Sequence, residues 1–196
     1  MYGLVNRALQ RFLCDTYGAG AWHDIARATG LRLDDFEPLL TYPEELTMKI
    51  LAAASERLRQ STDDLLEDLG TYLVSHPTYE ASRRLLRFGG GSFVDFVHSL
   101  DDLPDRARLA LPDLVFPRLA VEARSARGFL LTVGPGMQGF SHVLTGVLRG
   151  MADDYGALAL IEHTAGTDGQ ATILVEVHDT RFAKGRRFEL AVRVAS

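Results

Sequence analysis

The chain has 196 residues, of which 46% are apolar and 24% are charged, and its formal net charge is −5. This composition predicts one folded domain with a substantial core and excludes a disordered chain. The 21 basic residues form no block and are outnumbered by 26 acidic ones, which argues against nucleic-acid binding. The single cysteine, Cys14, excludes a disulfide framework and a multi-cysteine metal site. Because no apolar run approaches the roughly 20 residues of a membrane span and no signal peptide is present, we expect a reduced, cytoplasmic protein.

The first half of the chain carries apolar residues at helical spacing. Helix starts are indicated by Pro43 and by Ser61 with Asp64 three residues later, and helix ends by Gly18 and Gly30. The predicted helices cover residues 2–17, 22–29, 43–58 and 61–74, and a further short helix carries Leu85 and Leu86. Ser92 then predicts the N-cap of a longer helix over residues 92–104, which Pro104 ends.

Strand patterns dominate the second half of the chain. They predict strands over residues 114–122, 128–133, 157–161, 171–177 and 187–194, and a helix over residues 138–154. Strand 187–194 alternates apolar and polar residues, as a half-exposed antiparallel strand does, and Gly166 to Gly169 predict a hairpin loop. We therefore expect a single α+β domain over residues 1–196. In it a helical N-terminal subdomain (about 1–60) packs on an α+β subdomain (about 61–196) with an antiparallel sheet and helices.

A glycine-rich stretch, Gly134-Pro135-Gly136-Met137-Gln138-Gly139, spells the G-x-G-x-x-G motif between a predicted strand and a predicted helix. The strands that follow are antiparallel in character, and Asp153 and Asp154 lie at a helix end, whereas a dinucleotide site needs an acid after a parallel strand. We interpret the stretch as a strand–helix turn. A nucleotide-dependent reductase is the alternative, which a thermal shift with NADH or NADPH would test.

The six histidines form no helical metal-binding pair. His163 and His178 are predicted on neighbouring strands as surface residues, with His163 opposite about Thr172. Ser141 and His142 are adjacent, but no carboxylate lies nearby in sequence to orient the imidazole, so no catalytic triad is predicted. We therefore expect that the protein is not an enzyme.

Several segments together resemble one known family. They are residues 1–9, 17–18, 22–25, 52–55, 85–87 and 96–101, and Pro112. These segments are similar to those of the H-NOX family, the heme domains of bacterial nitric-oxide and oxygen sensors and of the soluble guanylate cyclase β subunit. The resemblance covers essentially the whole chain and implies the H-NOX fold.

The resemblance also indicates where the residues that bind heme should lie. The axial histidine of the family follows a Leu-Asp-x-Leu segment, and here Pro104 follows Leu100-Asp101-Asp102-Leu103. Proline has no side-chain lone pair and cannot ligate iron. The Tyr-x-Ser-x-Arg motif that holds the heme propionates falls on Val133, Pro135 and Met137, none of which donates a side-chain hydrogen bond. His142, and less favourably His98, are the candidates to replace the missing ligand.

The apolar lining of the family pocket, in contrast, is expected to be retained. Its predicted members are Leu4, Val5, Leu73, Phe96, Val97, Leu100, Leu103, Pro104, Pro117, Val133, Met137, Val143 and Leu144. A pocket without polar anchors should bind an apolar molecule such as a fatty acid, and no cofactor is expected. Architecturally similar folds, the 4-vinyl-reductase-like domains and the palmitate-holding subunits of vesicle-tethering complexes, bind apolar molecules; this is an analogy of fold alone.

The working hypothesis is a non-enzymatic sensor that binds an apolar ligand without heme. Ligand binding would shift the helical part against the α+β part. The resemblance implies that the partner is a signalling protein such as a histidine kinase or a nucleotide cyclase. One alternative is a heme-binding NO or O2 sensor with an unconventional axial ligand. Another is an interaction module whose cavity has collapsed, in which case Leu100→Trp should lower stability.

Overall fold

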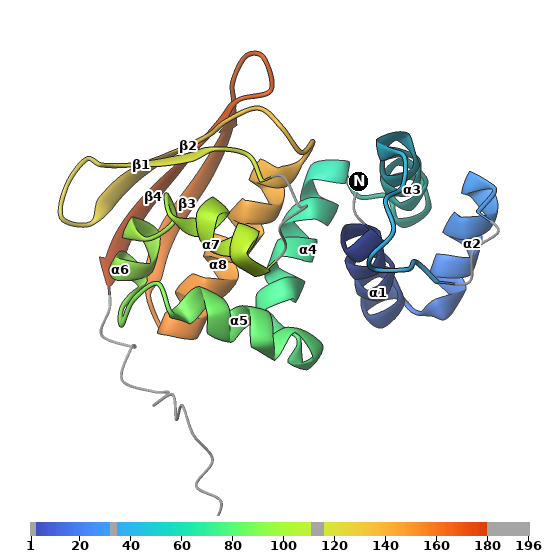
Figure 1. Ribbon diagram of the computed structural model, residues 1–196, viewed down its shortest axis with the longest axis horizontal. Coiled ribbons are helices and arrows are strands. Elements are labelled where there is room, and N and C mark those ends of the chain that lie inside the picture. Colours follow the sequence, from blue (N-terminus) through green and yellow to red (C-terminus); the bar gives the residue numbers. More distant parts are fainter. Residues whose placement is uncertain (1–2, 32–34, 111–115, 180–196) are drawn as a thin grey trace, which may run out of the picture.

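The computed structural model describes residues 3–31, 35–110 and 116–179 (Figure 1). Its helices are α1 (Gly3–Tyr17), α2 (Ala19–Thr29), α3 (Glu44–Leu58), α4 (Thr62–Ser75), α5 (Glu80–Arg87), α6 (Phe93–His98), α7 (Leu103–Ala110) and α8 (Phe140–Tyr155), with a 3-10 turn at Pro77–Tyr79. The strands are β1 (Leu119–Ala123), β2 (Gly128–Val133), β3 (Leu158–Ala165) and β4 (Ala171–Asp179). This arrangement confirms the expected α+β class. None of the described helices is long and apolar enough to cross a membrane.

Two hydrophobic cores lie on either side of the central helices. The first joins α1, α2 and α3 to one face of α4 through buried residues such as Phe12, Trp22 and Ile50. The second joins the sheet to α6 and α8 around Phe96, Phe129 and other buried residues. In Figure 1, α4 and α8 stand between the sheet and the group formed by α1, α2 and α3.

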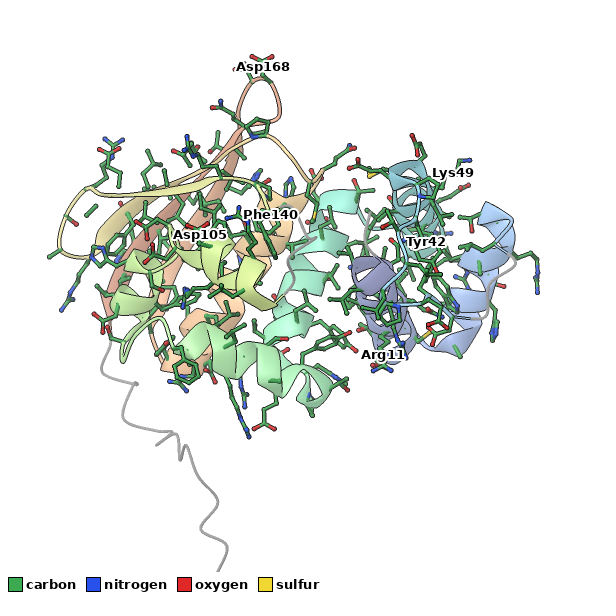
Figure 2. The ribbon with its side chains drawn as sticks, viewed as in Figure 1. Arg11, Tyr42, Lys49, Asp105, Phe140 and Asp168 are labelled. Atoms are coloured by element: carbon green, nitrogen blue, oxygen red, sulfur yellow. The ribbon has the colours of Figure 1, made fainter. Side chains whose placement is uncertain are left out.

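The sheet is antiparallel throughout, with the strand order β1-β2-β4-β3. The β3–β4 hairpin closes through residues 166–170, where Asp168 and Gly169 adopt positive φ angles, and Figure 2 shows Asp168 at its tip. The predicted hairpin loop is therefore confirmed. His163 pairs with Ile173, however, and Thr164 pairs with Thr172, so the expected register was wrong by one residue.

Glycines explain how α4 and α8 approach each other so closely. A Cβ at Gly70 would overlap the carbonyl of Val143, and a Cβ at Gly146 would overlap the carbonyl of Glu67. Gly146 interrupts the helical pattern of the sequence, but in the structure it lies inside α8, where the absence of a side chain permits backbone-to-backbone contact. The two helices consequently form one tightly packed pair in the middle of the molecule.

The predicted helix over residues 92–104 is wrong. It divides into α6, which ends at His98, and α7, which begins at Leu103. A Ser92–Asp95 capping box starts α6, and Arg106 of α7 donates hydrogen bonds to the carbonyl and hydroxyl oxygens of Ser99, which fixes the two helices around the turn. Pro104 lies in the first turn of α7, where a missing N–H leaves no helical hydrogen bond unmade, so it follows a helix start and does not end a helix.

Strand boundaries differ from the prediction in smaller ways. The predicted strand 114–122 is observed only from Leu119, because Pro117 has no backbone N–H to donate to a ladder. Strands β3 and β4 extend beyond their predicted ends, to Ala165 and Asp179. Residues 114–115 and the whole predicted strand 187–194 lie outside the described part of the chain.

Candidate functional site

A cleft of about 530 Å³ lies between the helical part and one end of the sheet. Its walls come from α3, α4, the β2–α8 connection, the first turn of α8 and the β3–β4 hairpin. This volume lies within the range of small-molecule sites. The lining therefore joins segments that are far apart in sequence.

Apolar side chains form part of the cleft lining, and the glycine-rich stretch over residues 134–139 forms another part. Met48, Leu51, Leu66, Met137 and Phe140 contribute apolar side chains. Figure 2 shows Phe140 at the start of α8, between the sheet and α4.

Close packing accounts for the glycines in this wall. A Cβ at Gly139, whose φ angle is +78°, would overlap the Leu66 side chain, and a Cβ at Gly136 would lie 3.3 Å from Cγ of Pro117. The glycines thus allow a tight turn from strand β2 to helix α8, as expected from the sequence. The sheet is antiparallel, whereas a dinucleotide-binding loop follows a strand of a parallel sheet.

A polar cluster forms another part of the cleft lining. Ser141 Oγ lies 3.0 Å from His163 Nε2, and the tilted rings of His163 and His142 lie with centroids 4.0 Å apart. The imidazole of His142 lies between two carboxylates of α4, with Nδ1 3.5 Å from Glu67 and Nε2 3.5 Å from Asp63. Glu67 also pairs with Arg149.

Charge and burial act differently on the two imidazoles. Burial lowers the pKa of His163, and the neighbouring His142 lowers it further, against the opposing effects of Glu67 and Asp63. His163 is therefore uncharged at neutral pH. Its Nε2 accepts a hydrogen bond from the Ser141 hydroxyl or donates one to it, according to the tautomer. Because the carboxylates pair with His142 and not with His163, the cluster lacks the Ser-His-acid order of a catalytic triad.

This cluster was not predicted from the sequence. His163 was expected on the surface, whereas the structure shows it half-buried against α8. No carboxylate was expected near His142, because Asp63 and Glu67 are 79 and 75 residues away in the chain. The spacing of Asp63 and Glu67, four residues apart, was a local signal that both point from one helix face. Which element that face meets is a long-range property that local patterns do not contain.

Most of the predicted pocket lining lies in the second core. Phe96, Val97, Leu100, Val133 and Leu144 are buried there, and Leu103 and Met137 pack against it. Pro117 is buried against Gly136. Val133 and Met137 also line the cleft, so they connect the predicted pocket to the observed one.

The remaining predicted lining residues lie elsewhere. Leu73 and Val143 pack against the first core. Leu4 is 36% exposed near the start of α1, and Val5 beside it is half-buried. Pro104 is half-buried in the first turn of α7.

The two candidate replacement ligands are far from equivalent. His98 is exposed at the end of α6 and packs edge-on against Phe129, with ring centroids 4.8 Å apart. Because the helix breaks after His98, His98 and Pro104 lie on different helices, α6 and α7. His142 lines the cleft, but both of its ring nitrogens face carboxylates. Among the described residues, no group of three or more His, Cys, Asp and Glu side chains is placed to hold a metal ion.

Comparison with known families identifies relatives over most of the chain. The sequence profile of the haem-NO-binding family (HNOB) matches residues 2–163. Soluble guanylate cyclase gcy-31 of Caenorhabditis elegans is 26% identical over 79% of the chain, and soluble guanylate cyclase 89Db of Drosophila melanogaster is 22% identical over 90%. The chain spans only 22% and 29% of the lengths of these two relatives.

Solved structures share the fold. The Fe(II) unliganded H-NOX protein from K. algicida superposes with a TM-score of 0.79 at 17% identity, covering 93% of this chain and 99% of that one. An H-NOX protein from S. oneidensis in the Fe(II)NO ligation state gives a TM-score of 0.73 at 16% identity, covering 91% of this chain and 100% of that one. At these identities the likeness establishes the H-NOX fold and no more.

Proposed function

Because the chain belongs to the haem-NO-binding family, we propose that it is a sensor domain that binds an apolar small molecule without heme and signals to a partner protein. The observation that carries this proposal is Pro104. At the place where the family resemblance puts the axial histidine, the chain has a proline in the first turn of α7, and proline offers iron no lone pair.

The other residues around the expected heme position do not fit the group either. Val133 is buried in the second core, and Pro135 and Met137 have no side-chain donor for a propionate. Pro117, which the resemblance places against the porphyrin, packs directly on Gly136. None of Val133, Pro135 and Met137 therefore offers a charged partner to a propionate.

The cleft supplies the volume for the ligand in this proposal. Its apolar side chains provide a surface for an apolar body, and Val133 and Met137 belong both to it and to the predicted lining. A fatty acid or similar molecule of this size would cover the half-buried side chains of Met48 and Met137, which stabilises the complex by roughly 25 cal/mol per Å² of apolar area removed from water.

The proposed signal is a change in the relative position of the elements that meet at the cleft. The lining combines α3 and α4 with the β2–α8 connection and the β3–β4 hairpin. A ligand between them would bias the position of the helical part against the sheet. The guanylate cyclase relatives support a nucleotide cyclase as the partner, and the family resemblance also supports a histidine kinase.

The experiment that tests ligand binding is mass spectrometry of an organic extract of the purified protein. We expect an apolar molecule in near-stoichiometric amount in the wild type and little of it in Met137→Trp, whose indole would fill the cleft. Circular dichroism should show that Met137→Trp remains folded. Equal ligand content in the two proteins, or no ligand and no binding of an apolar fluorescent probe by the wild type, would contradict the proposal.

A heme-based gas sensor is the second candidate, because the structural relatives include Fe(II) proteins. It requires His142 or His98 to act as the axial ligand. His142 would then have to exchange its contacts with Asp63 and Glu67 for a bond to iron. A heme-to-protein ratio near one that falls on His142→Ala or His98→Ala would favour this candidate.

A further inference from the structure

The lining of the cleft combines apolar and polar side chains, which constrains what kind of molecule fits it. Met48 and Met137 contribute half-buried apolar side chains, whereas Ser141 and His163 contribute a hydroxyl and an imidazole. Such a lining suits a ligand that has an apolar body and one hydrogen-bonding head.

The carboxylates near Ser141 and His163 outnumber the guanidinium groups. Asp63 and Glu67 lie near the two nitrogens of His142, and Glu67 also pairs with Arg149. Asp63 lines the cleft itself. A ligand carboxylate would therefore approach an existing negative charge, while Arg149 already pairs with Glu67.

The Ser141–His163 pair offers hydrogen bonds without a net charge. The 3.0 Å contact leaves the hydroxyl able to donate or accept, according to the imidazole tautomer. The His163 ring packs against the His142 ring with centroids 4.0 Å apart, and burial disfavours a positive charge on His163. His163 is thus a poor partner for an anion and a good one for a neutral donor or acceptor.

We propose that Ser141 and His163 form a subsite for an uncharged hydroxyl or carbonyl head group, so that the ligand is a neutral amphiphile and not a carboxylate. This inference rests on the proposed binding function and narrows its ligand class from apolar molecules in general, fatty acids included, to fatty alcohols and related neutral molecules. The apolar body would lie against Met48 and Met137.

The test compares two ligands of equal chain length, 1-dodecanol and dodecanoate, by displacement of the neutral fluorescent probe N-phenyl-1-naphthylamine at pH 7.5. Both are kept below the solubility limit of dodecanol and the critical micelle concentration of dodecanoate. We expect dodecanol to bind at least about tenfold more tightly than dodecanoate. Replacing Asp63 by asparagine should improve dodecanoate binding more than dodecanol binding, because it removes the negative charge at the lining.

Variants of His163 connect this selectivity to the subsite. His163→Leu should weaken dodecanol binding by about three- to tenfold, the effect of one lost hydrogen bond, whereas His163→Gln should retain most of it. His178→Gln, on the exposed end of β4, is the matched control and should have no effect.

The outcomes separate the two proposals. Dodecanoate binding as tightly as dodecanol, or dodecanol binding that His163→Leu leaves unchanged, would overturn the subsite while leaving apolar binding intact. If the probe does not bind, or if neither amphiphile displaces it, the proposed function itself fails and the subsite with it.

Discussion

Single glycines set the distance between the two central helices. Gly70 of α4 and Gly146 of α8 each face a backbone carbonyl of the other helix. Any side chain at either position must push the helices apart or distort them, and the displacement would reach the cleft because α4 and α8 both line it.

Alanine substitution at Gly70 should therefore lower the free energy of unfolding by roughly 1–3 kcal/mol. Gly20→Ala is the matched control, since a Cβ at Gly20 in α2 meets open space. Alanine there should raise stability by up to about 1 kcal/mol through its higher helix propensity. Urea denaturation of the two variants measures both values, and equal effects would contradict the close packing of α4 on α8.

His163 gives stability a defined dependence on pH. Because its pKa is lowered in the folded protein, by burial first and by His142 second, the unfolded chain binds more protons below about pH 6.5. The free energy of unfolding should therefore fall as the pH drops below about 6.5. Above that pH, His163 is uncharged in both the folded and the unfolded chain and should not affect the free energy of unfolding through its titration.

Replacing His163 by glutamine should reduce that decline. The measurement is the slope of unfolding free energy against pH between about pH 5 and 6.5, in wild type, His163→Gln and the exposed-site control His178→Gln. A slope that His163→Gln leaves unchanged, or that His178→Gln alters equally, would show that His163 is not held uncharged by its surroundings.

Helix ends were the best predicted features among the elements. Ser61, Ser92 and Gly30 each lie at a helix terminus as the sequence indicates, because capping depends on residues within one turn. The division between α6 and α7 was not predicted, since the apolar spacing from Phe93 to Leu103 fits one helix. The hydrogen bonds from Arg106 to Ser99 that accompany the break depend on folding the chain back on itself.

The capping box of α6 provides a test at this scale. Ser92 accepts a hydrogen bond from the backbone N–H of Asp95, and the Asp95 carboxylate accepts one from the N–H of Ser92. Ser92→Ala should lower the free energy of unfolding by about 1 kcal/mol, whereas Ser82→Ala, at an exposed site within α5, should change it by less than about 0.5 kcal/mol. Guanidinium denaturation distinguishes them, and a neutral Ser92→Ala would contradict the cap.

For the whole molecule, the fold class and the sheet direction were predictable and the cleft was not. A short apolar run bounded by glycines, such as that of β2, identifies a strand, and the family resemblance supplies the order of the elements. The cleft depends on which surfaces of α3, α4 and the hairpin meet, and this assembles Met48, Asp63 and His163 from distant segments. Of the predicted lining residues, Val133 and Met137 are the two that reach it.

Two tryptophan substitutions distinguish packed core from open cleft. Leu100 is fully buried in the second core, so Leu100→Trp should cost roughly 1–3 kcal/mol or more of stability. Met137 is partly buried and lines the cleft, so Met137→Trp should cost less than about 1 kcal/mol. Thermal unfolding measures the difference, and similar losses for both variants would mean that no open cleft accepts the ring.

The proposal that this family member works without heme rests on Pro104, Val133, Pro135 and Met137. The most direct test is the visible absorption spectrum of the purified protein, before and after titration with hemin. We predict no Soret band in the protein as purified and no saturable band at a ratio near one heme per chain after titration. A Soret band at that ratio, lost in His142→Ala or His98→Ala, would contradict the proposal and identify a heme sensor with a different axial ligand.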